Sequence, residues 1–187
     1  MWLYLLYLTT AAILTIMVLV IHEMGHWAVL RYYQIPVASW GIGFGPRLFT
    51  WGRIRLHLFP IGAYVEPGAG YPEAPPVFRI WIALGGPLAN LLYGGLLAAL
   101  APLAANGDPH HALALLANFN LALAAFNLLP VPPLDGWAAL VAFVERLGHP
   151  LHSRTKVMAS RVGNGFVWAI ATWAIGETAW PWLLGHG

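Results

Sequence analysis

Four segments of this chain are long, apolar and almost free of charged residues, and they restrict the fold more than any other feature. They cover about residues 3–30, 77–103, 112–129 and 165–184, and each approaches the roughly 20 residues that a helix needs to cross a bilayer. Only 9% of the 187 residues are charged, against about 25% in soluble globular proteins. The sequence therefore predicts a membrane α-helical fold with about four transmembrane helices, in a single domain over residues 1–187.

The stretch between the first two apolar segments, about residues 35–67, follows a different pattern. Residues 53–58 alternate polar and apolar side chains with period two, which is typical of a half-buried strand. Residues 50–53, which include Gly52, suit a hairpin turn that leads into this strand. We therefore expect a small β-sheet or hairpin on the cytoplasmic face of the membrane, between the first two spans.

The nine Lys and Arg residues are distributed unevenly along the chain. They lie in two groups, beside the first two spans and between the third and fourth: Arg31, Arg47, Arg53, Arg55, Arg79, and Arg146, Arg154, Lys156, Arg161. Because basic loops stay on the cytoplasmic side, we expect both of these regions inside and both termini outside. A net charge of +2 without a basic run argues against a nucleic-acid partner, whereas membrane lipid is an expected one.

Three ionisable residues lie within five positions of the first apolar segment, in His22-Glu23-Met24-Gly25-His26. Helical spacing places His22 and His26 on one face, within reach of a single zinc ion. Glu23 cannot bind that ion in the same geometry, and it suits a general base that acts on the metal's water. The alternative is a chance polar cluster satisfied by neighbouring helices, although ionisable groups inside a membrane are costly.

A catalytic zinc site needs a third protein ligand, and the chain has no cysteine to supply it. The candidates are the other histidines and four acidic residues: Asp108, Asp135, Glu145 and Glu177. Asp135 follows the third span at the inner depth of the two histidines, in a proline-broken segment of the kind that lines cavities. Asp135 is therefore the predicted third ligand. Its alternative role is to cap the N-terminus of a helix over about residues 137–147.

Two asparagines lie at the same depth. Asn90 ends the small-residue motif GGPLAN at residues 85–90, near the inner end of the second span. It suits either a hydrogen bond between packed helices or a contact with the substrate or its tetrahedral intermediate. Asn127 lies one turn before Pro130 and suits either binding of an extended substrate backbone or support of the site.

Three motifs together resemble the site-2 protease family of intramembrane zinc metalloproteases. They are HEMGH at residues 22–26, GGPLAN at 85–90 and NLLPVPPLDG at 127–136, and the resemblance covers about residues 21–136. It implies one zinc ion with His22, His26 and Asp135 as ligands, and Glu23 as the catalytic base. A prokaryotic cell membrane is the expected location, with the active site near the cytoplasmic face.

The resemblance also implies that Asn90 and Asn127 support substrate binding or the transition state. Family members cleave transmembrane segments of other membrane proteins, often regulators such as anti-sigma factors. Many members carry PDZ or CBS domains, which are not visible in this sequence, so we expect a partner to supply the regulation. Trp137 stands where several relatives have a second glycine after the Asp-Gly pair.

Two other functions fit part of the pattern. A zinc transporter would need acidic or histidine residues along a path through the bilayer, and the outer halves of the spans have almost none. An inactive scaffold that binds transmembrane helices would not need Glu23. The β-region has two open roles, which are to shield the zinc from lipid or to pair with an extended substrate strand.

Overall fold

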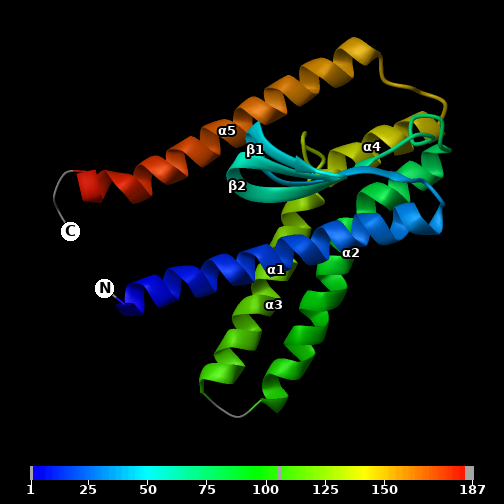
Figure 1. The fold of residues 1–187 in the computed structure, drawn as a ribbon. Helices are drawn as coiled ribbons and strands as arrows, with labels where there is room; N and C mark the ends of the chain where they lie inside the picture. Colours follow the sequence, from blue (N-terminus) through cyan, green and yellow to red (C-terminus); the bar gives the residue numbers. More distant parts are fainter. Residues whose placement is uncertain (1, 105–106, 184–187) are drawn as a thin grey trace.

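The structure is a computed structural model that describes residues 2–104 and 107–183. The described residues form α1 (Trp2–Tyr32), β1 (Val37–Trp51), β2 (Ile54–Pro67), α2 (Pro76–Leu100), a 3-10 turn η1 (Ala101–Leu103), α3 (Asp108–Asn127), α4 (Asp135–Arg146) and α5 (Ser153–Leu183). All four predicted apolar segments are helical, apart from residues 128–129, which follow α3, and residue 184, which lies outside the described residues. In Figure 1, α1 crosses the antiparallel pair α2 and α3.

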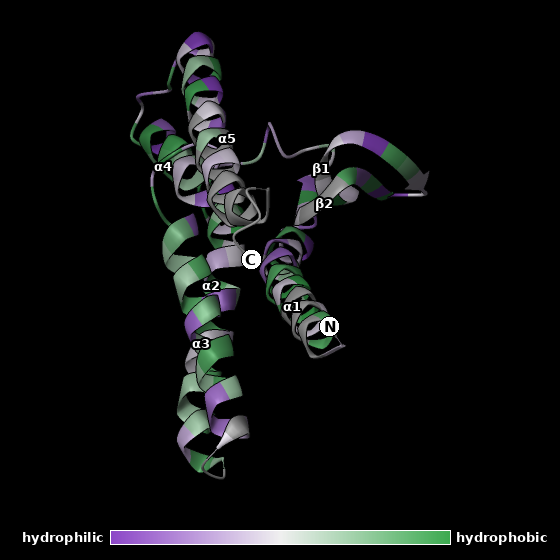
Figure 2. Cartoon of the chain, turned by 90° about the vertical axis from the view of Figure 1, so that its left-hand side faces the viewer, coloured by the Kyte–Doolittle hydropathy of each residue, from purple (hydrophilic) through white to green (hydrophobic). Residues whose placement is uncertain are grey.

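Two helical stretches among the described residues are long and apolar enough to cross a membrane. They are Ile13–Tyr32, with 20 residues, and Pro76–Leu103, with 28. Figure 2 shows that apolar residues also predominate along α3. The count of four spans and the outward orientation of both termini stay predictions.

Glycines bring α1 and α2 into backbone contact. A Cβ on Gly85 would lie 2.6 Å from the Gly25 carbonyl oxygen, and a Cβ on Gly25 would overlap the Gly85 carbonyl in turn. Small residues at such a crossing are the usual device for close helix approach in membranes. The contact holds His22 and His26, on either side of Gly25, directly against α2.

A second close contact joins α2 to α3. A Cβ on Gly94 would lie 3.0 Å from the Asn120 Cβ and 3.1 Å from the Ala117 carbonyl oxygen. Asn90 lies one turn before Gly94 on α2. The close approach therefore places the polar side chains of Asn90 and Asn120 next to each other between the two helices.

The hairpin β1–β2 folds into four short paired segments. Trp40 pairs with both Ile54 and Val65, and Ile42 pairs with both Leu56 and Ala63, while residues 49–51 pair with residues 54–56. The segments therefore lie in the order 49–51, 54–56, 40–42 and 63–65, with 63–65 at one edge.

The predicted hairpin turn is present, with Gly52 at a φ of 58°. Hydrophilic and hydrophobic residues are interspersed along the hairpin, which projects from the helices on the side of α1 (Figure 2). Its placement at the cytoplasmic face of a membrane stays a prediction.

Candidate metal centre

His22, His26 and Asp135 converge at the crossing of α1 with α2. The Asp135 Oδ2 atom lies 2.9 Å from the His22 Nε2 and 3.4 Å from the His26 Nε2, and the two Nε2 atoms are 3.2 Å apart. The two histidine side chains are only 7% and 12% exposed, and that of Asp135 is 22% exposed. The three residues predicted as ligands are thus brought together in a largely buried position.

Asp135 reaches the histidines because of its place in the first turn of α4. A Cβ on Gly136 would overlap the Leu128 carbonyl, so a glycine is needed where α4 packs on the end of α3. The alternative role of Asp135 as an N-cap is not realised, since Leu134 is the cap residue and makes no side-chain capping bond. The predicted helix over residues 137–147 begins two residues earlier, at Asp135.

An ion pair at the other end of α4 ties that helix to α2. The Arg79 guanidinium donates to the Glu145 carboxylate at 2.7 Å. This bond holds the pKa of the Glu145 carboxyl below its usual range. Glu145, a candidate ligand in the sequence, therefore has a structural partner and lies outside the group of converging donors.

Each histidine is held by a hydrogen bond on the ring nitrogen that points away from Asp135. The His26 Nδ1 lies 2.7 Å from the Ile82 carbonyl oxygen on α2, and the His22 Nδ1 lies 3.0 Å from the Asn90 Oδ1. Both partners are oxygen acceptors, so each Nδ1 carries a proton and donates it. The Gly86 N–H approaches the His26 Nδ1 only at 3.4 Å, a much weaker contact than that to Ile82.

The chemistry of this donor set fits a zinc ion. With a proton on each Nδ1, the neutral rings of His22 and His26 present bare Nε2 lone pairs to the carboxylate of Asp135. Three acceptors without a hydrogen between them repel one another unless a cation lies among them. Four ligands at about 2.1 Å in a tetrahedron are about 3.4 Å apart, and the three donor atoms, at 2.9, 3.2 and 3.4 Å from one another, come near this spacing. The bonds from the outer ring nitrogens match the supporting contacts that zinc-bound histidines make in general.

Gly86 keeps the space beside the donors open. A Cβ at this position would overlap the His26 Nε2 and lie 2.6 Å from the His22 Nε2. No residue with a side chain fits here without moving the imidazole rings. The second glycine of the GGPLAN motif is thus explained by the room that the donor atoms need.

Glu23 lines the same cavity as the three donors. This cavity has a volume of about 510 Å³ and is bounded by α1, α2, the start of α4 and the 62–65 segment of β2. The Glu23 side chain is buried, with the residue 8% exposed. A carboxylate in this place lies beside the donor set and outside it, as a general base requires.

The two predicted asparagines have different surroundings. Asn127 lines the cavity, and its amide NH₂ donates to the Leu123 carbonyl at 3.0 Å. Asn90 is fully buried behind His22, and its amide atoms face His22, Asn120 and the Val18 carbonyl. Of the two roles open for Asn90, the geometry favours hydrogen bonding between helices. A substrate role for either residue stays a prediction.

Sequence reasoning missed Asn120. It is fully buried and bonded to Asn90. The only signal was its amide side chain within the third apolar segment, and Asn118 two residues earlier carries the same signal without making such a bond.

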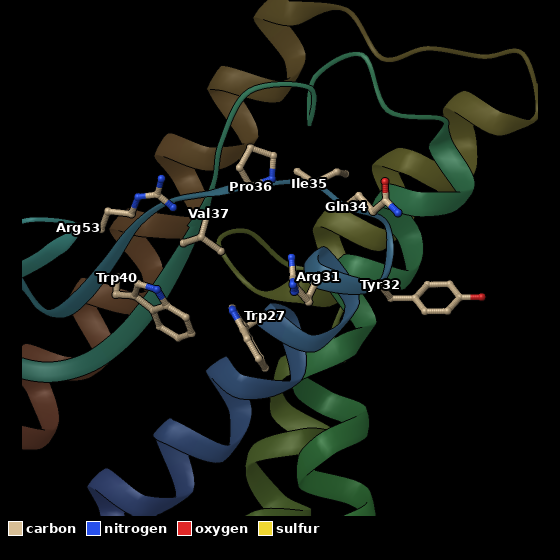
Figure 3. A pocket seen from close by; sticks show the side chains of 9 residues that line it. All are labelled: Trp27, Arg31, Tyr32, Gln34, Ile35, Pro36, Val37, Trp40 and Arg53. Atoms are coloured by element: carbon tan, nitrogen blue, oxygen red, sulfur yellow. The ribbon is translucent and has the colours of Figure 1, made fainter.

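A larger cavity, of about 810 Å³, lies away from these residues, at the end of α1. Figure 3 shows Arg31 and Arg53 on its wall, together with Trp27 and Trp40. Its lining contains no histidine or carboxylate. Size is therefore a poor guide to the chemistry of this molecule, because the three converging candidate ligands line the smaller cavity.

Known proteins share both the sequence pattern and the fold. The profile of peptidase family M50 matches residues 10–106 and 101–170. A predicted zinc metalloprotease of Synechocystis is 34% identical over 169 residues, which cover 88% of this chain and 39% of that protein. The predicted zinc metalloprotease Rip2 of Mycobacterium tuberculosis is 34% identical over 138 residues, covering 65% of this chain and 52% of Rip2.

A solved structure, the site-2 protease of Methanocaldococcus jannaschii, has the same fold. It superposes with a TM-score of 0.57 at 24% identity, over 92% of this chain and 69% of that one.

The curated relatives are longer than this chain. The matched segment covers 20% of a predicted zinc metalloprotease of Thermotoga maritima, at 36% identity, and about half of Rip2. The family match nevertheless extends over most of the present sequence and includes the converging residues His22, His26 and Asp135. The resemblance seen in the three motifs is thereby confirmed, and the chain belongs to peptidase family M50.

Proposed function

We propose that this chain is a zinc-dependent endopeptidase that cleaves peptide bonds within or near transmembrane segments of other membrane proteins. The observation that carries the proposal is that three candidate metal ligands and a second, buried carboxylate, that of Glu23, line one cavity. In this reading His22, His26 and Asp135 hold one zinc ion. The proposed substrates are membrane-bound regulators whose cleavage transmits a signal.

The residues divide the chemistry between them. A zinc ion held by His22, His26 and Asp135 would supply a Lewis acid for the activation of water and the polarisation of the scissile carbonyl. Glu23 takes the proton of that water on its carboxylate and delivers it to the leaving amine. Asn127, which lines the same cavity, would bind the extended substrate backbone.

An apolar cleft supports a membrane-embedded substrate. It has a volume of about 310 Å³ and runs between α1 and the hairpin, with Val20, Trp40 and Ile42 on its walls and Glu23 at one side. Such a lining suits the side chains of a transmembrane segment, since it offers almost no polar partner. A peptide that passes along the cleft reaches the general base directly.

A helical substrate must unwind before it is cut, because its carbonyls are engaged in helix hydrogen bonds. The edge segment of residues 63–65 lines the cavity with Glu23 and, among the described residues, pairs on one side only. An unwound substrate that adds to this edge would place its backbone next to the general base. The same segment also covers the site, so pairing and shielding are compatible roles.

The direct test uses purified protein in lipid nanodiscs, a synthetic transmembrane peptide and the variant Glu23→Gln. We expect one zinc per chain in both proteins, measured by mass spectrometry of the metal. Cleavage by the variant should be about 10²- to 10⁴-fold slower, because the general base is lost while the ligands remain.

A chelator should abolish cleavage by the natural protein, and added zinc should restore it. Undiminished cleavage by Glu23→Gln would refute the proposal, as would a natural protein that cleaves without bound zinc. Mass spectrometry of the products locates the cut bond relative to the apolar segment of the peptide.

A further inference from the structure

A chain of hydrogen bonds leads from His22 to a third helix. The His22 Nδ1 lies 3.0 Å from the Asn90 Oδ1 on α2, and the Asn90 Nδ2 donates to the Asn120 Oδ1 on α3 at 2.9 Å. The Asn120 Nδ2 then donates to the Leu116 carbonyl oxygen at 2.8 Å. Both amides are fully buried, so water does not complete or compete with these bonds.

The direction of every bond follows from the last one. A backbone carbonyl can only accept, so the NH₂ of Asn120 must face Leu116 and its oxygen must face Asn90. The NH₂ of Asn90 must then face Asn120, which is consistent with its second contact to the Val18 carbonyl at 3.4 Å. The oxygen of Asn90 is left for His22, whose Nδ1 therefore carries the proton.

We propose that Asn120 is a positioning residue that sets the tautomer and ring orientation of His22 through Asn90. This inference rests on the proposed role of His22 as a zinc ligand. With the proton held on Nδ1, the ring presents the bare Nε2 that a metal requires. Asn120 touches neither the donor atoms nor the cavity, and it acts only through the second amide.

The two histidines are thereby oriented by different means. His26 donates directly to a backbone carbonyl, that of Ile82, which cannot reverse its polarity. His22 donates to a side-chain amide, which can rotate by 180° and then offer a donor instead of an acceptor. Asn120 removes this ambiguity, since a rotated Asn90 would set its oxygen against the Asn120 oxygen. A packing role alone would not require a defined direction of the amides.

The test compares Asn120→Leu with Asn118→Leu. Asn118 lies on the same helix, is exposed and makes no hydrogen bond to the relay, so it is the matched control. Zinc affinity is measured by competition with a chelator, and ring tautomers are read from histidine ¹⁵N shifts in the zinc-free protein. We expect Asn120→Leu to weaken zinc binding about 10- to 100-fold, the usual cost of losing a supporting contact.

The shifts should show an unprotonated Nδ1 appearing at His22 and not at His26, because only the Nδ1 of His22 depends on the relay. Asn118→Leu should leave both the affinity and the tautomers unchanged. Natural zinc affinity with an unchanged His22 tautomer in Asn120→Leu would overturn the inference, and so would equal weakening by the two variants.

A second pair of variants keeps the inference testable if Asn120→Leu does not fold. Asn120→Thr and Asn120→Val have nearly the same shape, but only threonine can donate to the Leu116 carbonyl and accept from Asn90. Tighter zinc binding by the threonine variant supports the relay, and equal binding refutes it. Failure of the proposed function is distinguishable, because the natural protein itself would then bind no zinc at His22.

Discussion

The helical crossing and the hairpin satisfy their polar side chains in different ways. At the crossing, His22, Asn90 and Asn120 are buried and each takes its partner from another helix. In the hairpin, Glu66 is bonded to Arg55 and Ser39 of the same sheet, and the ion pair is one-third to one-half exposed.

The difference shows where a substitution will matter. Removal of a buried partner leaves a polar group without water, at a cost of about 1–3 kcal/mol. Removal of an exposed partner leaves a group that water can solvate, and exposed ion pairs contribute about 0–1 kcal/mol. The crossing is therefore sensitive to single polar changes, whereas the hairpin tolerates them.

Asp135→Ala is expected to have the largest effect. The substitution removes the one anionic member of the candidate ligand set, which would pair with the positive charge of the metal. Loss of one partner of a buried ion pair costs about 3–5 kcal/mol. Zinc affinity should fall by more than about 100-fold in a chelator competition. Glu73→Ala, an exposed carboxylate in the loop before α2, is the control and should bind zinc as the natural protein does. Equal affinities of the two variants would contradict the assigned donor set.

Gly86→Ala should come next. The added methyl overlaps the His26 Nε2, and overpacking of this kind costs about 1–3 kcal/mol. We expect zinc affinity to fall roughly 5- to 150-fold. Gly95→Ala on the same helix meets nothing within 4 Å and provides the control. If both variants bind zinc equally, the close approach of Gly86 to the donors is wrong.

Glu145→Gln should lower the stability of the folded protein by about 1–2 kcal/mol, because it removes the negative charge that strengthens a partly buried hydrogen bond from Arg79. The pKa of Glu145 is lowered by that bond, so its contribution is complete above the ordinary pKa of about 4.3. It is lost as the pH falls from there through the lowered value. Thermal unfolding between pH 7 and pH 3 should show a loss that is smaller in the variant.

Glu66→Gln should have the smallest effect, below about 1 kcal/mol, because the pair with Arg55 is exposed and glutamine keeps an oxygen for the buried Ser39 hydroxyl. The Ser39 hydroxyl lowers the pKa of Glu66 and Arg55 adds to the effect, so the sign of the pH dependence is the same as for Glu145. Hydrogen exchange of the β1 and β2 amides is the suitable measurement, because the change is local. A larger loss than in Glu145→Gln would reverse the contrast between the two regions.

Much of the fold could be predicted from the order of residues. Apolar runs of membrane-spanning length can satisfy their backbone only as helices, and the four predicted segments are almost entirely helical. The period-two pattern and Gly52 similarly predicted the hairpin and its turn. The observed helix ends differ from the predicted ones by several residues. The difference is largest for α5, which begins at Ser153, because its first turns are polar and carry no apolar signal that would predict them.

The candidate site could be predicted only in part. Spacing along one helix is enough to bring His22 and His26 together, since they are four residues apart. The depth of Asp135 favours it over the other acidic residues, but its position depends on the contact between Gly136 and Leu128.

The sequence by itself determined the helices, the hairpin, the two histidines on one face and Glu23 beside them, because all of these depend on local periodicity. The tertiary structure brought the predicted Asp135 to the histidines, and it alone decided which of two neighbouring asparagines bonds to Asn90 behind His22. Asn118 and Asn120 differ in nothing but the side of α3 that they occupy, and the packing of α3 on Gly94 buries one of them against Asn90. That choice depends on how helices distant in sequence meet, which no local pattern encodes.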